Sequence, residues 1–238
     1  MGFIRCRYNV RYIWSIELMA GLKVTTEPTA EPLSLQEVKE YLRLEDASDE
    51  RVVQPMITAV RQFAEEHLGR GLMQQTLTLS IDTAINTENP LWEGMRTAPD
   101  INYYKNYIVL PKSPVISVTT VKTYDDSDNA TTMAASKYYV DTAREPARIV
   151  LRTGETFPTA LRVANAIEVV YVSGYATAYA IPEPIRLGMF QHIAHMYEHR
   201  GDMGEYLQAR EIPAMIKMLY APYRIHGGLG SSMFMSLG

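Results

Sequence analysis

The sequence lacks most features that mark secreted, membrane-spanning or nucleic-acid-binding proteins. Its 238 residues include one cysteine, Cys6, which excludes an intramolecular disulfide and is typical of a reducing compartment. No apolar run reaches the roughly 18 residues that a membrane span requires. The net charge of −4 lacks the basic excess that non-specific binding to nucleic acid needs. These absences leave an ordinary globular protein, and 47% hydrophobic residues are enough to build a core.

The N-terminus also lacks a complete signal peptide. Residues 1–18, MGFIRCRYNVRYIWSIEL, place arginines before an apolar patch, but the patch is short and Glu17 interrupts it. No small-x-small cleavage site follows, so secretion is not expected. Met19 is an alternative initiator, and we keep the hypothesis that the natural protein begins there.

Catalytic motifs are missing as well. The sequence has no G-x-S-x-G nucleophile elbow, and the glycine-rich HGGLGSS lacks the Lys-Ser/Thr of a phosphate-binding loop. The acidic DDSDN, Asp125 to Asn129, lacks the glycine and the closing glutamate of a calcium loop. It predicts a solvated hairpin turn instead. No enzyme activity and no cofactor are expected.

One stretch does resemble a metal site. QHIAHMYEHRGD places His192, His195 and His199 within an arc of about 60° on a helix. A metal-dependent enzyme would use these three imidazoles, and it remains the least favoured alternative. The zinc protease pattern needs a glutamate directly after its first histidine, and here Ile193 and Met196 follow the histidines. The stretch therefore favours the end of a packed helix, with no metal bound.

Helical patterns occupy both ends of the chain. Ser34 with Glu37 forms a capping-box pattern for a helix that runs to about Leu44, and Leu33 with Val38 forms a hydrophobic staple. A second helix ends at Gly69. A third begins at Pro182 or Pro184 and ends at Gly201, and a fourth spans about Leu207 to Tyr220.

Between these helices the pattern alternates with a period of two. Six short runs predict strands: TLTLSID, YIVL, VISVTTVKTY, YYVD, ARIVLR and AIEVVYVSGY. No helix of crossover length separates them, so the sheet should be antiparallel. We therefore predict an α+β fold, a helical bundle with an inserted antiparallel β lobe of about six strands. The predicted parts are an N-terminal arm (1–32), a helical domain (33–75 plus 181–222), the β lobe (76–180) and a flexible C-terminal tail (223–238).

Six segments in this order resemble the head-tail connector (adaptor) proteins of tailed bacteriophages. They are PLSLQEVKEYLRLEDASDE, AEEHLGRGLMQQTLTL, IVLPKSPVISVTTVKTYD, YYVDTAREPARIVLRTG, IEVVYVSGYA and IPEPIRLGMFQHIAHMYEHRGD. The resemblance covers about Pro32 to Asp202, and it rests on the order of the segments because no single one is diagnostic. The N-terminal extension and the long loop before Tyr107 depart from the usual pattern.

The resemblance implies a structural role in the virion neck, the junction of head and tail. Adaptor subunits, made in the cytoplasm of the bacterial host, form a ring of about twelve copies below the portal. The implied partners are the portal protein, a stopper or tail-completion protein and further copies of this chain, and genome DNA passes through the channel without sequence-specific binding. An alternative is that the chain is itself the stopper or tail-completion protein.

Two further features fit a ring around DNA. Between Glu31 and Arg70 stand nine acidic and five basic residues, a net charge of −4 that would repel phosphate. Sixteen tyrosines, many between Tyr103 and Tyr179, make the β lobe a candidate for contacts between subunits.

The C-terminal tail is the expected portal-binding segment. It is rich in glycine and serine and holds Met and Phe side chains that could fill a groove on a partner. In the adaptor family the C-terminal segment commonly engages the portal. The expected portal-binding residues are Arg224, Met233, Phe234 and Met235.

Overall fold

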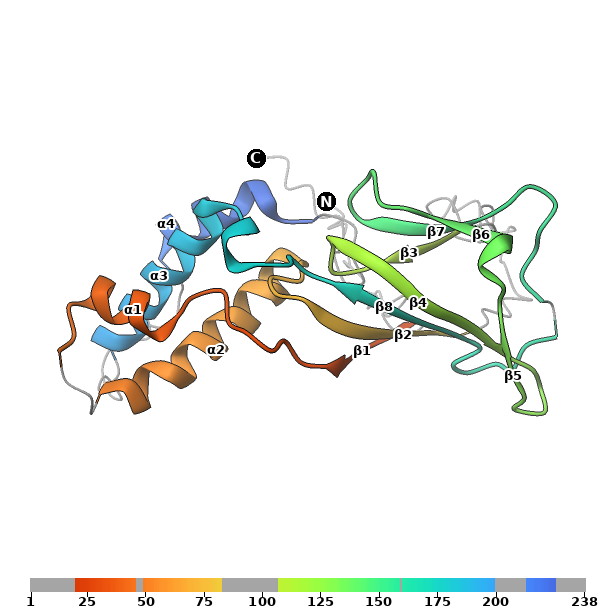
Figure 1. Ribbon diagram of the computed structural model, residues 1–238, viewed down its shortest axis with the longest axis horizontal. Helices are drawn as coiled ribbons and strands as arrows, with labels where there is room; N and C mark the ends of the chain where they lie inside the picture. The colour runs from red at the N-terminus through yellow and green to blue at the C-terminus, as the bar shows by residue number, and fades with distance from the viewer. Residues whose placement is uncertain (1–19, 46–48, 83–106, 159, 200–212, 226–238) are drawn as a thin grey trace, which may run out of the picture.

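The computed structural model describes residues 20–45, 49–82, 107–158, 160–199 and 213–225. In this part of the chain four α-helices form one lobe and eight strands form another, and the two lie side by side along the long axis (Figure 1). We call them the helical lobe and the β lobe. All strand pairs between named strands are antiparallel, which confirms the α+β class. No helix of the described residues is long and apolar enough to cross a membrane.

The first two helices have the ends that the sequence predicts. Helix α1 spans Leu35–Leu42, and the Ser34 hydroxyl accepts a hydrogen bond from the Glu37 amide at 3.2 Å. The Glu37 carboxylate in turn accepts one from the Ser34 amide at 2.8 Å, so the capping box is confirmed. Helix α2 spans Glu50–Leu68 and ends at Gly69, whose φ of 65° lies in the left-handed region.

The second pair of helices agrees with the prediction at the start of α3 and differs from it at the start of α4. Helix α3 spans Glu183–Glu198 with Pro184 in its first turn, as predicted, whereas the predicted stop at Gly201 lies outside the described residues. Helix α4 spans Ala214–Tyr220 and begins after Pro213, so the prediction of one helix from Leu207 is wrong at Pro213. Proline lacks an amide hydrogen and clashes with the preceding turn, so it starts this helix and cannot continue one.

The helical lobe has its own hydrophobic core. The connection before α1 and all four helices contribute to it, and Leu33 and Val38, the predicted staple pair, are both buried. The other fully buried members with at most 1% exposure are Val53, Ile57, Val60, Ala64, Leu68, Leu72, Ile185, Met189, Ile193, Ile216 and Tyr220. Helices α3 and α4 approach closely at Gly188, which has no side chain. A Cβ atom at that position would lie only 2.5 Å from Cε1 of Tyr220.

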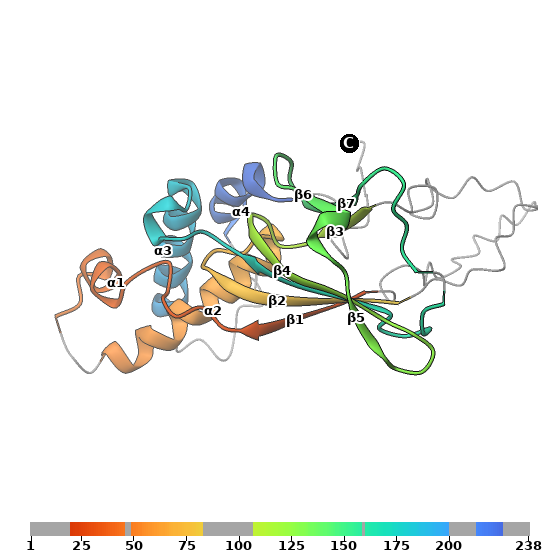
Figure 2. The same cartoon turned by 45° about the vertical axis from the view of Figure 1, so that its right-hand side comes forward.

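Eight strands form two sheets in the β lobe. The strands are β1 (Ala20–Thr26), β2 (Gln75–Ile81), β3 (Tyr107–Leu110), β4 (Val115–Tyr124), β5 (Ala130–Thr132), β6 (Tyr138–Asp141), β7 (Ala147–Leu151) and β8 (Ile167–Ser173). One sheet has the order β1-β2-β8-β4-β5 and the other β3-β7-β6. Figure 2 shows the two sheets as separate layers. Their facing sides share a core that includes Leu77, Leu110, Ile149 and Tyr171.

The six predicted strands are all present, and two more were missed. Strand β5 has three exposed residues and no apolar alternation, so nothing in its sequence marks it. Strand β1 occupies part of the predicted N-terminal arm and pairs with β2 at the edge of the five-stranded sheet. The sequence around Thr25 and Thr26 is typical of a linker. These residues belong to a strand because β1 pairs with β2. Apart from the start of the C-terminal tail, which is described below, the domain boundaries stay a prediction.

The turn between β4 and β5 is the hairpin that DDSDN predicts. The Asp125 carboxylate accepts hydrogen bonds from the Ser127 amide at 2.9 Å, the Asn129 amide at 2.8 Å and the Asn129 side chain at 3.1 Å. These bonds, those of Asn129 foremost, lower the pKa of Asp125. The carboxylate therefore caps its own turn.

Gly188 yields a stability prediction. The substitution Gly188→Ala gains about 1 kcal/mol of helix propensity, but overpacking against a buried ring costs up to about 3 kcal/mol. We expect a net loss of about 1–2 kcal/mol in the free energy of unfolding, measured by urea denaturation. Gly21→Ala is the control, because no atom lies within 4 Å of a Cβ at that exposed position. Equal stability of the two variants would contradict this account of helix packing.

Candidate functional site: the α3 histidines, the lobe junction and the C-terminal segment

Two of the three candidate metal ligands, His192 and His195, lie on the last turns of α3, and His199 directly follows its last residue. His192 is 8% exposed and meets the Phe63 ring edge-on, with ring centroids 5.1 Å apart. His199 is exposed, and its Nδ1 lies 2.8 Å from the His195 carbonyl oxygen at the helix end. Within the described residues, no group of three His, Cys, Asp or Glu side chains is placed to hold a metal ion. The contacts of His192 and His199 are those of a packed helix and its cap.

His192 belongs to an aromatic cluster that joins three helices. Phe63 and His67 on α2 stack with ring centroids 5.8 Å apart, and His67 lies 5.9 Å from the Tyr220 ring on α4. Burial lowers the pKa of His192, and the nearby His195 lowers it further. Burial, with Arg224 and Lys217, also lowers the pKa of His67. Both rings are therefore neutral where the helices pack.

The buried His192 and the half-buried His67 predict a loss of stability in weak acid. Because both pKa values lie below the ordinary 6.5, the unfolded chain binds protons at a higher pH than the folded chain. The contribution of the two neutral histidines to the free energy of unfolding is therefore fully present above about pH 6.5. It is lost as the pH drops through the folded pKa values. We expect a lower Tm at about pH 5.5 than at about pH 7.5, followed by circular dichroism.

Matched variants separate this effect from general acid destabilisation. His192→Gln should reduce the difference in Tm between the two pH values. His199→Gln alters an exposed histidine at the end of the same helix and should leave the difference unchanged. The same pH dependence in both variants would contradict the role of His192.

The C-terminal segment is held on the helical lobe at its start. A short 3₁₀ turn, η7 (Ala221–Tyr223), follows α4, and the Ile225 amide donates a hydrogen bond to the Leu68 carbonyl at 2.9 Å. The Ile225 side chain is buried beside Gly69, whereas Arg224 is exposed. The prediction of a flexible tail from residue 223 is therefore wrong for residues 223–225. The end of α2 leaves carbonyl groups without helical partners, and Ile225 supplies one of the missing donors. Met233, Phe234 and Met235 lie outside the described residues.

Arg70 connects this segment to the β lobe. Its Nε donates to the Tyr223 carbonyl, and its two terminal nitrogens form a bidentate pair with Glu145 in the β6–β7 turn, one at 2.9 Å. Burial disfavours the charge of Arg70, but the carboxylate of Glu145 outweighs it and the pKa of Arg70 is raised. The backbone of Arg70 also bridges to Ser113, which precedes β4. One residue thus ties α2, the C-terminal segment and both sheets together.

A second buried arginine holds the connections between the lobes. Arg61 on α2 is 4% exposed, donates to Glu31 at 2.8 Å and lies 3.5 Å from Glu65. Glu65 is 3% exposed, and its other oxygen accepts from the Leu72 amide and the Gln75 side chain, both at 3.0 Å. The network therefore links the segment before α1, α2 and the start of β2.

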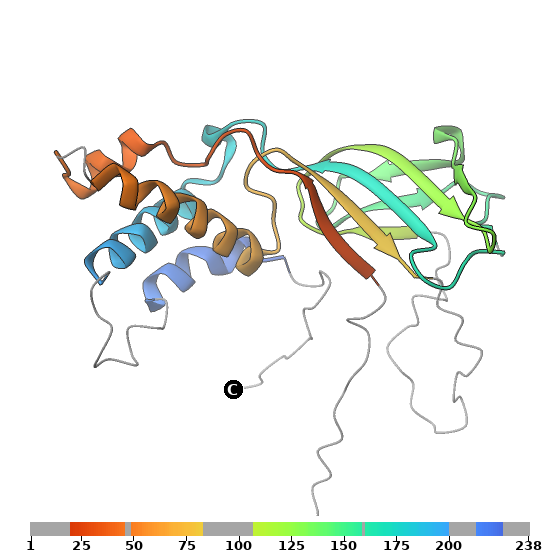
Figure 3. The ribbon, with the colours of Figure 1, turned by 90° about the horizontal axis from the view of Figure 1, so that it is seen from below.

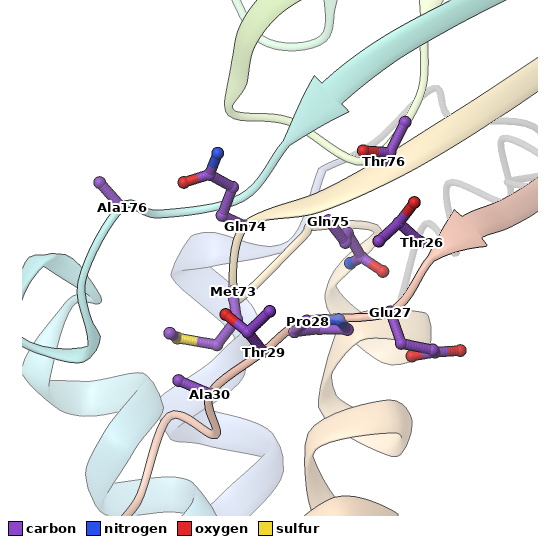
Figure 4. A pocket seen from close by; sticks show the side chains of 10 residues that line it. All are labelled: Thr26, Glu27, Pro28, Thr29, Ala30, Met73, Gln74, Gln75, Thr76 and Ala176. Atoms are coloured by element: carbon purple, nitrogen blue, oxygen red, sulfur yellow. The ribbon is translucent and has the colours of Figure 1, made fainter.

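Beside this network lies a hollow of about 300 Å³ between the lobes (Figure 4). Three connecting segments line it: Thr26, Glu27, Pro28, Thr29 and Ala30; Met73, Gln74, Gln75 and Thr76; and Ala176. Glu27 is the one charged residue among them, so the hollow offers no acid–base pair for catalysis.

No local sequence pattern identified the residues of the junction between the lobes. Arg70 contacts Glu145 and Tyr223 across 75 and 153 positions of sequence, and no local pattern records such pairs. Arg61 lies next to Val60 of the apolar stripe of α2. A charged residue in such a position is usually at the edge of the buried face, with its side chain in solvent. The burial of Arg61 depends on Glu31, which comes from the segment before α1, together with Glu65 one turn further along α2.

The fold itself can be compared with known structures. No protein-family model matches the sequence, and no curated protein matches it. A chain from the neck of an empty gene transfer agent (GTA) particle, computed with C6 symmetry, has a TM-score of 0.65 at 21% identity, over 88% of this chain and 98% of that chain. A chain from the virion of the native GTA particle has a TM-score of 0.63 at 19% identity, over 87% and 98%. A chain from the neck of the native GTA particle, computed with C12 symmetry, has a TM-score of 0.59 at 22% identity, over 88% and 98%. The chain therefore shares its fold, over nearly its whole length, with these particle chains.

Arg70 yields a second stability prediction. Arg70→Met removes the ion pair with Glu145 and the bond to Tyr223, and it leaves the carboxylate without this partner. Glu145 is 43% exposed, so water compensates it in part and we expect a loss of about 1–3 kcal/mol in the free energy of unfolding. Arg144→Met changes an exposed arginine in the same turn and should cost less than about 0.5 kcal/mol in urea denaturation. Arg70→Met with the stability of the parent chain would show that the junction does not depend on this residue.

Proposed function

We propose that this chain is a structural subunit of the neck of a tailed, phage-like particle, the adaptor that forms a ring below the portal. The ring joins the DNA-filled head to the tail and leaves a channel for DNA. The observation that carries the proposal is the likeness in fold to chains of GTA necks, which extends over 88% of this chain and 98% of the matching chain. A partial match of one lobe would support much less.

The order of the parts supports the adaptor among neck proteins. The six sequence segments that resemble adaptors fall on α1, α2 with β2, β3 with β4, β6 with β7, β8 and α3. Two of the matching necks were computed with C6 and C12 symmetry. A ring with such symmetry needs a subunit whose two sides carry different, complementary patches.

The charge of the helical lobe is compatible with a channel that does not grip DNA. Several acidic residues of the segment 31–70 have partners within the fold: Glu31 and Glu65 pair with Arg61, and Glu37 pairs with Arg186. Burial works against the charge of Glu37, but hydrogen bonds from Ser34 and Arg186 lower its pKa below the ordinary value. The carboxylates left on the surface carry the charge that would repel phosphate.

A stopper or tail-completion protein of the same neck is the second candidate, because the likeness in fold is to neck chains in general. The two roles differ in their partner: an adaptor contacts the portal directly. Chemical cross-linking of particles, followed by mass spectrometry, distinguishes them. Cross-links from this chain to the portal favour the adaptor, and cross-links only to tail-side proteins favour the alternative.

The C-terminal tail yields the functional prediction. We expect truncation after Ile225 to leave the fold intact and to yield DNA-filled heads without tails, because residues 226–238 contain the proposed portal-binding Met233, Phe234 and Met235. Electron microscopy of particles from cells that carry the truncated gene measures this.

A truncation that removes two more residues provides the control. Removal of residues from Arg224 onward also deletes Ile225, whose amide and buried side chain complete the end of α2, so it should lower Tm as well. Normal tailed particles from the chain that ends at Ile225 would contradict the proposed role of the tail.

A further inference from the structure

Helix α4 carries an apolar face that its own lobe does not use. Ile216 and Tyr220 point into the core, whereas Met215 is 61% exposed and Met218 is 74% exposed. The exposed residues that flank the two methionines are Ala214, Lys217, Ala221 and Pro222, of which one is charged. A surface helix is normally polar on its outer side, so an outer side of this composition indicates a contact with another surface.

The same face is positively charged at its edges. From Pro213 to Ile225 the chain contains Lys217 and Arg224 and no acidic residue, and both side chains are exposed. Burial of the two methionines by a partner would bring these cations close to the partner's surface. A partner with neighbouring carboxylates would therefore be favoured.

A second exposed face of the helical lobe lies on α2. Helix α4 packs mainly on α3 and meets α2 only near the ends of the two helices, where the His67 and Tyr220 rings lie 5.9 Å apart, whereas the first turns of α2 lie away from α4 (Figure 3). One exposed row of α2 presents Val52, Pro55 and Ala59, three small or medium apolar residues, followed by Gln62. It ends at Glu66, whose side chain is 84% exposed at 3.9 Å from Lys112.

The exposed charges of the connection before α1, of α1 and of α2 are complementary to those of α4. The connection before α1, together with α1 and α2, exposes the carboxylates of Glu27, Glu40, Glu45 and Glu66. In the same described stretch the exposed bases are Arg43 and Arg51. The exposed charges of α4 and the residues after it are thus basic, whereas those of the stretch that ends with α2 are acidic, with four carboxylates against two bases.

We propose that the outward face of α4 in one copy docks on the outward face of α2 in the next copy around the ring. The proposal rests on the proposed function, because it needs a ring of identical subunits. A cyclic ring requires two different patches on each subunit, and the exposed faces of α4 and α2 differ in side chains and in charge. Methionine side chains adapt to an irregular surface and fill the space above Pro55 and Ala59.

Cysteine pairs test the contact directly, because the sequence has one native cysteine to remove. Ala59→Cys and Met218→Cys are introduced together into a Cys6→Ser chain, and particles are purified from cells that carry this gene. Both positions are exposed, so each variant should keep the Tm of the parent. After mild oxidation we expect a ladder of disulfide-linked multimers on a non-reducing gel. A chain with Ser127→Cys in place of Met218→Cys, at the tip of the β4–β5 hairpin, should remain monomeric.

The outcomes separate the inference from the proposed function. Particles that contain the doubly substituted chain but give no multimers would overturn the α4–α2 contact and leave the neck assignment intact. Dimers from a chain with Met218→Cys alone would show that α4 meets α4, which also overturns it. Particles from which the chain is absent would count against the proposed function itself, and with it the ring on which the contact depends.

Discussion

The end of helix α2 is the constraint on which the rest of the structure depends. Within six residues the chain must leave the helix, pass between the lobes and enter β2. Gly69 allows the left-handed turn, and Arg70 then fixes the turn to the β lobe through Glu145 and to the C-terminal segment through Tyr223. Glu65, one turn earlier, receives the Leu72 amide on the way out. The orientation of the lobes follows from this short stretch and its buried charges.

What sequence could predict here was local. The capping box of Ser34 and Glu37, the glycine stop of α2 and the six alternating strands depend on neighbours a few residues away, and all were confirmed. Strand β1 and the packed Ile225 were missed because each forms only against a distant segment, β2 in one case and Leu68 in the other. The predicted start of α4 at about Leu207 was wrong, because Pro213 cannot continue a helix that begins before it.

The histidines of α3 illustrate why function was hard to find in motifs. Their spacing suits a metal, but His192 packs in an aromatic cluster and His199 caps the helix. A subunit of a large assembly acts through its surfaces, and surfaces combine residues from several segments. The apolar outer side of α4 is such a case, because Met215 and Met218 look like core residues in the sequence and lie exposed in the fold.

The central claim is that this chain forms a ring between head and tail. Electron cryo-microscopy of intact particles from the source that encodes it tests this most directly. The account predicts a ring of density below the portal into which the helical and β lobes fit, surrounding a channel wide enough for duplex DNA. A resolved neck in which no density accommodates this fold, with the chain absent from the particle's proteins, would contradict it.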